Sequence, residues 1–138
     1  MFEQMSDFFP NTVDPVMLTL FGSHLYGLDT PDSDRDYKGI YVPKKRDWVL
    51  DAYPKHLRHS TGGQHEKNTA EDVDVGLFSI QNFISNALKG ETFAIDMLHS
   101  ETPHYHNWIW NKIRNNRHRF YSREMKAFIG YAKRQANK

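Results

Sequence analysis

Cysteine does not occur among the 138 residues, which excludes disulfides, thiolate zinc sites and a cysteine nucleophile. No apolar run approaches the roughly 20 residues that a bilayer span needs, and the opening MFEQMSDFFP lacks the basic-then-apolar order of a secretion signal. These absences lead us to expect a cytoplasmic protein without a membrane partner. A content of 38% hydrophobic and 14% aromatic residues is sufficient for one folded domain with a packed core.

Charge is distributed unevenly along the chain. Residues 112–138 contain nine of the 18 Lys and Arg residues but one of the 17 Asp and Glu residues, a net charge of +8, whereas residues 1–111 carry −7. An acidic body with a basic tail predicts carboxylates that hold a metal and cations that meet a polyanion, although a solvated helix face explains the tail equally well. The candidate contacts to RNA are Arg114, Arg117, Arg119 and Arg123.

Three short segments have the pattern of β-strands. Residues 16–22 are an apolar run that ends at a glycine, and residues 34–42 and 72–78 alternate along the strand direction. The connection between the first two is too short for a crossover helix. Residues 51–71 are polar and contain one proline, two adjacent glycines and three histidines, so we expect an irregular loop there.

Helical patterns follow in the second half of the chain. Residues 79–90 predict the clearest helix, with Ser79 as its N-cap and Gly90 as its stop signal. Residues 93–100 predict a short helical turn. The remainder predicts two helices that break near residues 120–122, and the second is still amphipathic where the sequence ends. We therefore expect an oligomer or a partner chain to use these last helices.

An Asp-x-Asp pair opens the second expected strand. Asp34 and Asp36 have Cα atoms roughly 6 to 7 Å apart and side chains on one face, so their carboxylates repel and add nothing to β propensity. A divalent cation removes that repulsion, and Mg²⁺ prefers one or two carboxylates together with phosphate oxygens and water. A third carboxylate would position an attacking hydroxyl, and the next strand supplies Asp74 or its same-face neighbour Asp72. Acids on a solvated sheet edge are the alternative.

A Gly-Ser turn follows the first expected strand. Gly22 allows a phosphate to approach the backbone closely, and Ser23 offers a hydroxyl and an amide. A short helix that begins there would direct N–H groups toward the anion. We add His24 and Ser33 as candidate contacts to the nucleotide.

The order of these elements resembles the DNA polymerase β-like nucleotidyltransferase superfamily, in which a Gly-Ser turn ends one strand and Asp-x-Asp begins the next after about ten residues. GSHLYG followed by TPDSDRDYKGIYV is most similar to a family of RNA-repair-associated nucleotidyltransferases. The later DVGLFSIQNFISNALKGETFAIDMLHS is similar to that family's third acidic strand and the helix after it. By this resemblance, Asp74 matches the third acid.

The resemblance implies an α+β fold: a minimal polymerase-β-like palm, with a mixed sheet and helices on one side, followed by C-terminal helices. We expect residues 1–100 to form the nucleotidyltransferase core. Residues 101–138 would be a basic helical extension, either the start of a longer helical region or a part that a partner chain completes.

The resemblance also implies an Mg²⁺-dependent enzyme, with Mn²⁺ as an alternative, that transfers a nucleoside monophosphate from an NTP to a hydroxyl. Asp34, Asp36 and Asp74 would hold the metal, and we expect ATP as the donor. The expected acceptor is an RNA end, with a protein or small-molecule hydroxyl as the alternative. Two other classes stay open, namely an inactive, antitoxin-like module that binds nucleotide or RNA, and an RNA-binding domain driven by the basic tail.

Overall fold

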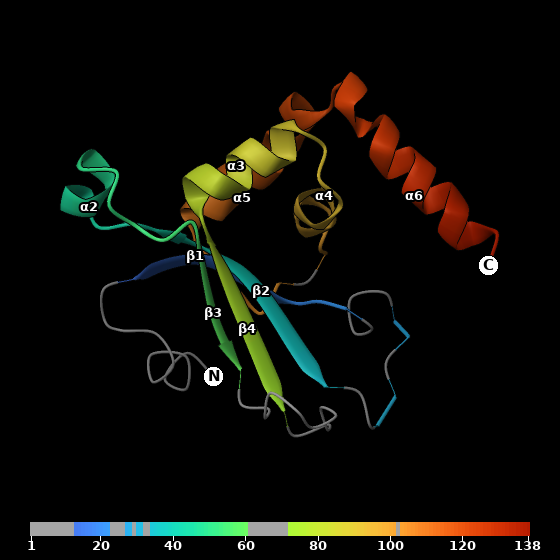
Figure 1. Cartoon of the computed structure of the whole chain (residues 1–138), viewed down its shortest axis with the longest axis horizontal. Helices are drawn as coiled ribbons and strands as arrows, with labels where there is room; N and C mark the ends of the chain where they lie inside the picture. Colours follow the sequence, from blue (N-terminus) through green and yellow to red (C-terminus); the bar gives the residue numbers. More distant parts are fainter. Residues whose placement is uncertain (1–12, 23–26, 29, 32–33, 61–71, 102) are drawn as a thin grey trace.

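The computed structural model describes residues 13–22, 27–28, 30–31, 34–60, 72–101 and 103–138. Its centre is a five-stranded mixed sheet in the order β3-β4-β2-β1-β5 (Figure 1). The parallel pair is β2 with β4, and the other neighbours are antiparallel. The strands are β1 (Asp14–Leu20), β2 (Arg35–Val42), β3 (His56–Ser60), β4 (Val73–Ser79) and β5 (Tyr105–His106).

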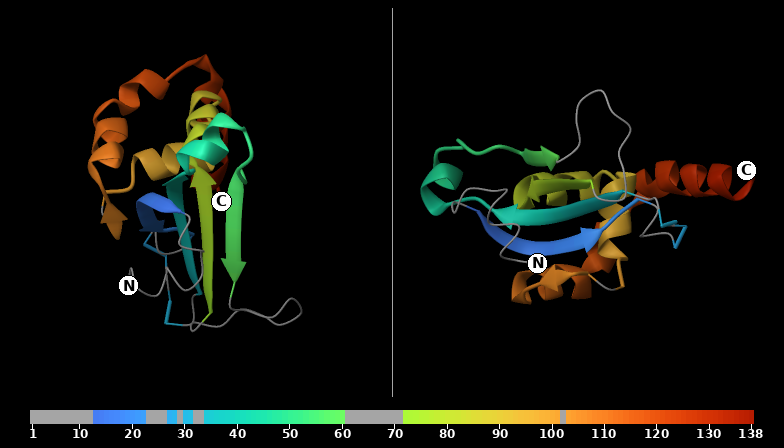
Figure 2. Two further views of the ribbon diagram at one scale, coloured as in Figure 1. Left: turned by 90° about the vertical axis from the view of Figure 1, so that its left-hand side faces the viewer. Right: turned by 90° about the horizontal axis from the view of Figure 1, so that it is seen from below.

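Helices follow β2 and β4 and occupy the C-terminal part of the chain. Those after β4 lie at the end of the sheet where that strand finishes, and α6 extends away from the sheet (Figures 1 and 2). None of the helices in the described ranges is long and apolar enough to cross a membrane. The helices are α2 (Lys45–Val49), α3 (Ile80–Leu88), α4 (Thr92–Leu98), α5 (Trp108–Asn115) and α6 (Lys126–Ala136), with 3-10 turns at Arg117–Phe120 and Arg123–Met125.

The expected fold class, α+β with a mixed sheet and helices on one face, is confirmed. The three expected strands correspond to β1, β2 and β4, and the expected helices to α3, α4, α5 and α6. The expectation of an irregular loop over residues 51–71 is wrong for residues 56–60, which form edge strand β3. The signal is weak because Leu57 is the one aliphatic residue of that strand, and edge strands are often charged and short.

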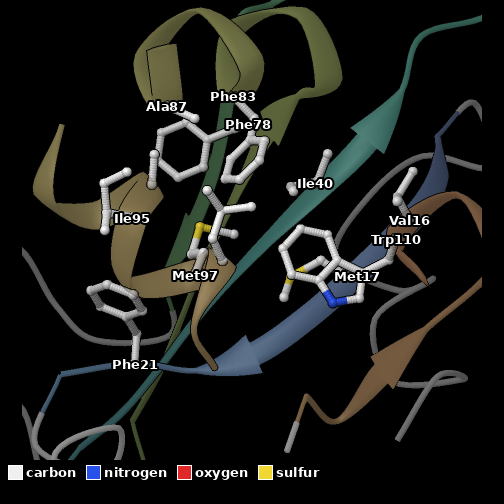
Figure 3. Close-up of a cluster of buried hydrophobic side chains, with 12 residues drawn as sticks. Val16, Met17, Phe21, Ile40, Phe78, Phe83, Ala87, Ile95, Met97 and Trp110 are labelled. Carbon is white, nitrogen blue, oxygen red and sulfur yellow. The ribbon is translucent and has the colours of Figure 1, made fainter. Parts of the chain in front are cut away.

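Two hydrophobic clusters lie on opposite faces of the sheet. The larger joins inward side chains of β1, β2 and β4 to α3, α4 and α5, with Trp110 fully buried (Figure 3). The smaller contains Tyr37, Val75 and Leu77, and its described members come from strands and flanking segments rather than helices. One face of the sheet is therefore the helix-covered face, and Asp36 shares it because strand side chains alternate.

The N-cap of α3 offers a test of how the helix start is stabilised. The Ser79 hydroxyl is buried and accepts a hydrogen bond of 3.2 Å from the Asn82 N–H. We expect Ser79→Ala to lower the free energy of unfolding by about 1 kcal/mol, measured by urea denaturation. Ser85→Ala, at an exposed position of the same helix, is the control and should cost nothing. Equal effects of both changes would contradict the capping role.

The last helix leaves apolar side chains exposed. Ile129 is 52% exposed and Tyr131 36% exposed, whereas Phe128 packs against the larger cluster. A groove of about 370 Å³ lies between α4 and α6 and is lined in part by Asp96, Phe128 and Tyr131. The partner expected for these helices stays a prediction.

Candidate active site

Three separate parts of the sequence meet at one end of the sheet. The antiparallel pairing of β1 and β2 puts Leu20 opposite Tyr37, and the Phe21 N–H then donates to the Asp36 carbonyl at 2.7 Å. The parallel pairing of β2 and β4 puts Asp36 directly opposite Asp74. The end of β1 and the beginnings of β2 and β4 therefore surround one point.

Gly22 follows β1 and forms one side of this site. Its backbone has φ of +62°, in the left-handed region that favours glycine. A Cβ built on Gly22 would lie 4.0 Å from Oδ2 of Asp36, so the turn and the acid are neighbours, as the resemblance implies. Ser23, His24 and Ser33, the other expected contacts to the nucleotide, lie outside the described residues.

The surroundings of Asp36 oppose the charge of its carboxylate. The pKa of its carboxyl is raised by burial first of all; Lys38 lowers it, Asp74 and Asp34 raise it, and Arg58 lowers it. The charges of Asp74 and Asp34 therefore both act on the Asp36 carboxyl. Lys38 and Arg58 offset part of this repulsion, and burial still leaves the pKa of Asp36 raised.

The register distinguishes the two candidates for the third acid. Asp74 is the residue paired with Asp36, and its charge acts on that carboxyl. Asp72 lies one residue before β4, where its backbone carbonyl accepts a hydrogen bond of 3.1 Å from the Arg35 N–H. The pairing thus brings Asp74, rather than Asp72, opposite Asp36, and the role of Asp74 as the third acid stays a prediction.

The chemistry of these donors suits a divalent cation, because carboxylate oxygens are the ligands that Mg²⁺ prefers. Burial is the main cause of the raised pKa of Asp36, and the repulsion from Asp74 and Asp34 that adds to it is the kind that a cation would relieve. In the described ranges, however, no three His, Asp or Glu side chains converge closely enough to hold a metal ion together. A metal site at Asp34, Asp36 and Asp74 is therefore a proposal.

A pocket of about 430 Å³ extends from Asp36 and Asp74 toward β3. It contains cations that sequence reasoning did not assign to the site. One is Lys38, two residues after Asp36 on β2. Its Nζ lies 4.2 Å from the centre of the Phe21 ring. Arg58 of β3 lies opposite Gly76 of β4. Lys38 could have been found from its alternation with Asp36, whereas Arg58 lies in the segment taken for a loop.

His56 forms the aromatic wall of the pocket. Its ring is stacked on Phe78, with centroids 4.3 Å apart and planes 4° apart. Burial lowers the pKa of His56, and the charges of Arg58 and Lys38 lower it further. The imidazole is therefore neutral at pH 7, beside two cations and two acids.

The four arginines expected to contact RNA, Arg114, Arg117, Arg119 and Arg123, lie elsewhere. Arg114 is on α5, and the other three are on the two 3-10 turns that follow it. In Figure 1 this region lies with the other helices, at the opposite end of the sheet from the start of β4. The structure does not bring these arginines to the acids, and their contact with RNA stays a prediction.

Comparison with known proteins gives the family. The chain is 40% identical over 131 residues to an uncharacterized 38.9 kDa protein in the nrdC-mobD intergenic region of Enterobacteria phage T4. The match covers 89% of this chain but 38% of that protein, so the chain spans well under half of its relative's length. The profile of the RNA repair pathway DNA polymerase beta family (RlaP) matches residues 9–138, which include every residue of the site described above. The chain therefore belongs to the RNA repair pathway DNA polymerase beta family.

Proposed function

We propose that the chain is a metal-dependent nucleotidyltransferase that moves a nucleoside monophosphate from an NTP to the hydroxyl of an RNA end. The observation that carries the proposal is the pairing of Asp36 with Asp74 beside the Gly22 turn. A sheet that served only as a scaffold would gain nothing from opposing carboxylates on adjacent strands.

Each part of the site has a distinct role in this proposal. The backbone at Gly22 approaches the triphosphate, and Asp34 and Asp36 are the residues that would hold a divalent cation. Asp74 orients the acceptor hydroxyl for attack on the α-phosphorus. A divalent cation would supply positive charge to the phosphates and lower the pKa of the hydroxyl.

The transfer itself is balanced without any further reactant. A bond forms between the acceptor oxygen and the α-phosphorus, and the bond between that phosphorus and the bridging oxygen to the β-phosphate breaks. Pyrophosphate leaves with the bonding electrons, and the hydroxyl proton passes to a carboxylate of the site. The protein contributes alignment of the two reactants and stabilisation of developing charge.

The test is transfer of label from each α-³²P-labelled NTP to single-stranded RNA, with Mg²⁺ and then with Mn²⁺. We expect labelled RNA with at least one NTP, ATP first among them, and no product in EDTA. Asp34→Ala should abolish labelling, whereas Asp47→Ala, on α2 at the far end of β2, should not. Label on a protein or on a small molecule, and none on RNA, would show that the acceptor is not an RNA end. Binding of NTP without any transfer would contradict the enzymatic proposal.

A further inference from the structure

The sheet order sets out the parts of the site in a line. Gly22 follows β1, Asp36 is on β2, Asp74 is on β4, and the pocket ends at β3. In-line displacement puts the leaving group and the attacking group on opposite sides of the α-phosphorus. If the triphosphate lies at the β1 side, the acceptor must approach from the β3 side.

The β3 side has the chemistry of a nucleotide site. Phe93, Phe78 and His56 form a continuous stack, with centroid distances of 4.6 Å and 4.3 Å. The stack begins at the larger cluster and ends at His56, which is exposed and lines the pocket. A base is the kind of planar group that would extend such a stack.

The charge and the volume of the pocket also suit a nucleotide. Arg58 lines the same pocket as His56, and a guanidinium binds phosphate through paired N–H groups. Ser60, the next β3 residue on this face, pairs with Asp74 in the sheet register and also lines the pocket. The volume of about 430 Å³ is within the range of small-molecule sites.

Gly76 makes the position of His56 possible. A Cβ at residue 76 would lie 2.9 Å from Nε2 of His56, closer than two such atoms can approach. Any larger residue on β4 would push the imidazole from its place. The atom in the way is the tip of a side chain, so the ring can move while the strands stay paired.

We propose that His56 and Arg58 form the acceptor subsite, which takes the 3′-terminal nucleotide of a single-stranded RNA. The base stacks on the imidazole, the backbone phosphate binds the guanidinium, and the terminal hydroxyl lies toward Asp74. This inference rests on the proposed function and adds the location and class of the acceptor.

The test is the affinity of the full chain for a fluorescent single-stranded oligoribonucleotide, measured by anisotropy with Mg²⁺ and without NTP, so that no turnover is needed. Loss of one stacked base or one phosphate contact should raise the Kd about tenfold. We expect this for His56→Ala and Arg58→Ala, whereas His56→Phe should retain affinity. Gly76→Ala should weaken binding like His56→Ala, while its circular dichroism stays that of the wild type.

The control is Arg46→Ala, which removes an exposed cation from α2 and should leave the affinity unchanged. Unchanged affinity in the His56 and Arg58 variants would overturn the inference. So would weakening by Arg119→Ala alone, a change in NTP affinity in place of RNA affinity, or no RNA binding by the wild type.

The two proposals can fail separately. RNA binding that depends on His56 and Arg58, without any transfer of label, would sink the enzymatic proposal and leave the binding subsite in place. Transfer of label with the same KM for RNA in wild type, His56→Ala and Arg58→Ala would sink the subsite and leave the enzyme.

Discussion

Asp36→Asn should lower the rate of nucleotide transfer by about 10²–10³-fold, the loss expected when one electrostatic contact to a transition state is removed. The side chain keeps its size but loses the charge that faces Asp74. The measurement is kcat for labelling RNA at saturating NTP. Asp74→Asn should give a similar loss and Asp72→Asn a much smaller one, because the register pairs Asp74 with Asp36. Equal losses at residues 72 and 74 would contradict this assignment.

Asp36→Asn should lower the rate of transfer but raise the stability of the fold at neutral pH. Burial and the neighbouring acids raise the pKa of Asp36. A carboxyl with a raised pKa contributes stability at acid pH and loses it as the pH rises through the folded-state pKa. At neutral pH without divalent cations, Asp36→Asn should therefore raise the melting temperature, whereas Asp47→Asn should not. A lower melting temperature for Asp36→Asn would mean that the acid is structural.

Among the glycines of the sheet, Gly39 should be the one at which an added methyl group destabilises the fold most. A Cβ there would lie 2.5 Å from the Met17 carbonyl oxygen and 2.7 Å from Cδ2 of Leu77. The first of these atoms belongs to the backbone of the paired strand β1 and cannot move without breaking the register. We expect a loss of about 3 kcal/mol and a melting temperature lower by about 10 °C, measured by calorimetry.

Gly130→Ala is the matched control for that change. Gly130 is inside α6, and a Cβ there would meet nothing within 4 Å. Alanine is the better helix former, so the variant should be more stable by up to about 1 kcal/mol. Similar stability of the two alanine variants would show that the close approach at Gly39 is not rigid.

Local patterns were sufficient to predict most of the elements. The alternation around Asp34 and Asp36 predicts β2, and the Ser79 and Gly90 signals bound α3 closely. Strand β3 was not predictable in this way because it pairs on one side only, with β4. Such a strand does not need alternating apolar residues.

The site was predictable only in part, for a related reason. Alternation puts Asp72 and Asp74 on the same face, so sequence alone leaves both as candidates for the third acid. The argument for Asp74 rests on its pairing with Asp36, a residue 38 positions earlier in the chain. Arg58 and His56 reach the acids by the same long-range pairing, through β3 and β4.

The parallel pairing of β2 with β4 also has a consequence for how the molecule folds. The pairing of β1 with β2 can form earlier because its strands are closer in the sequence, whereas β2 and β4 must meet over a longer separation, as between Asp36 and Asp74. That late meeting is the step that brings two like charges face to face. The acids should therefore slow the folding reaction itself.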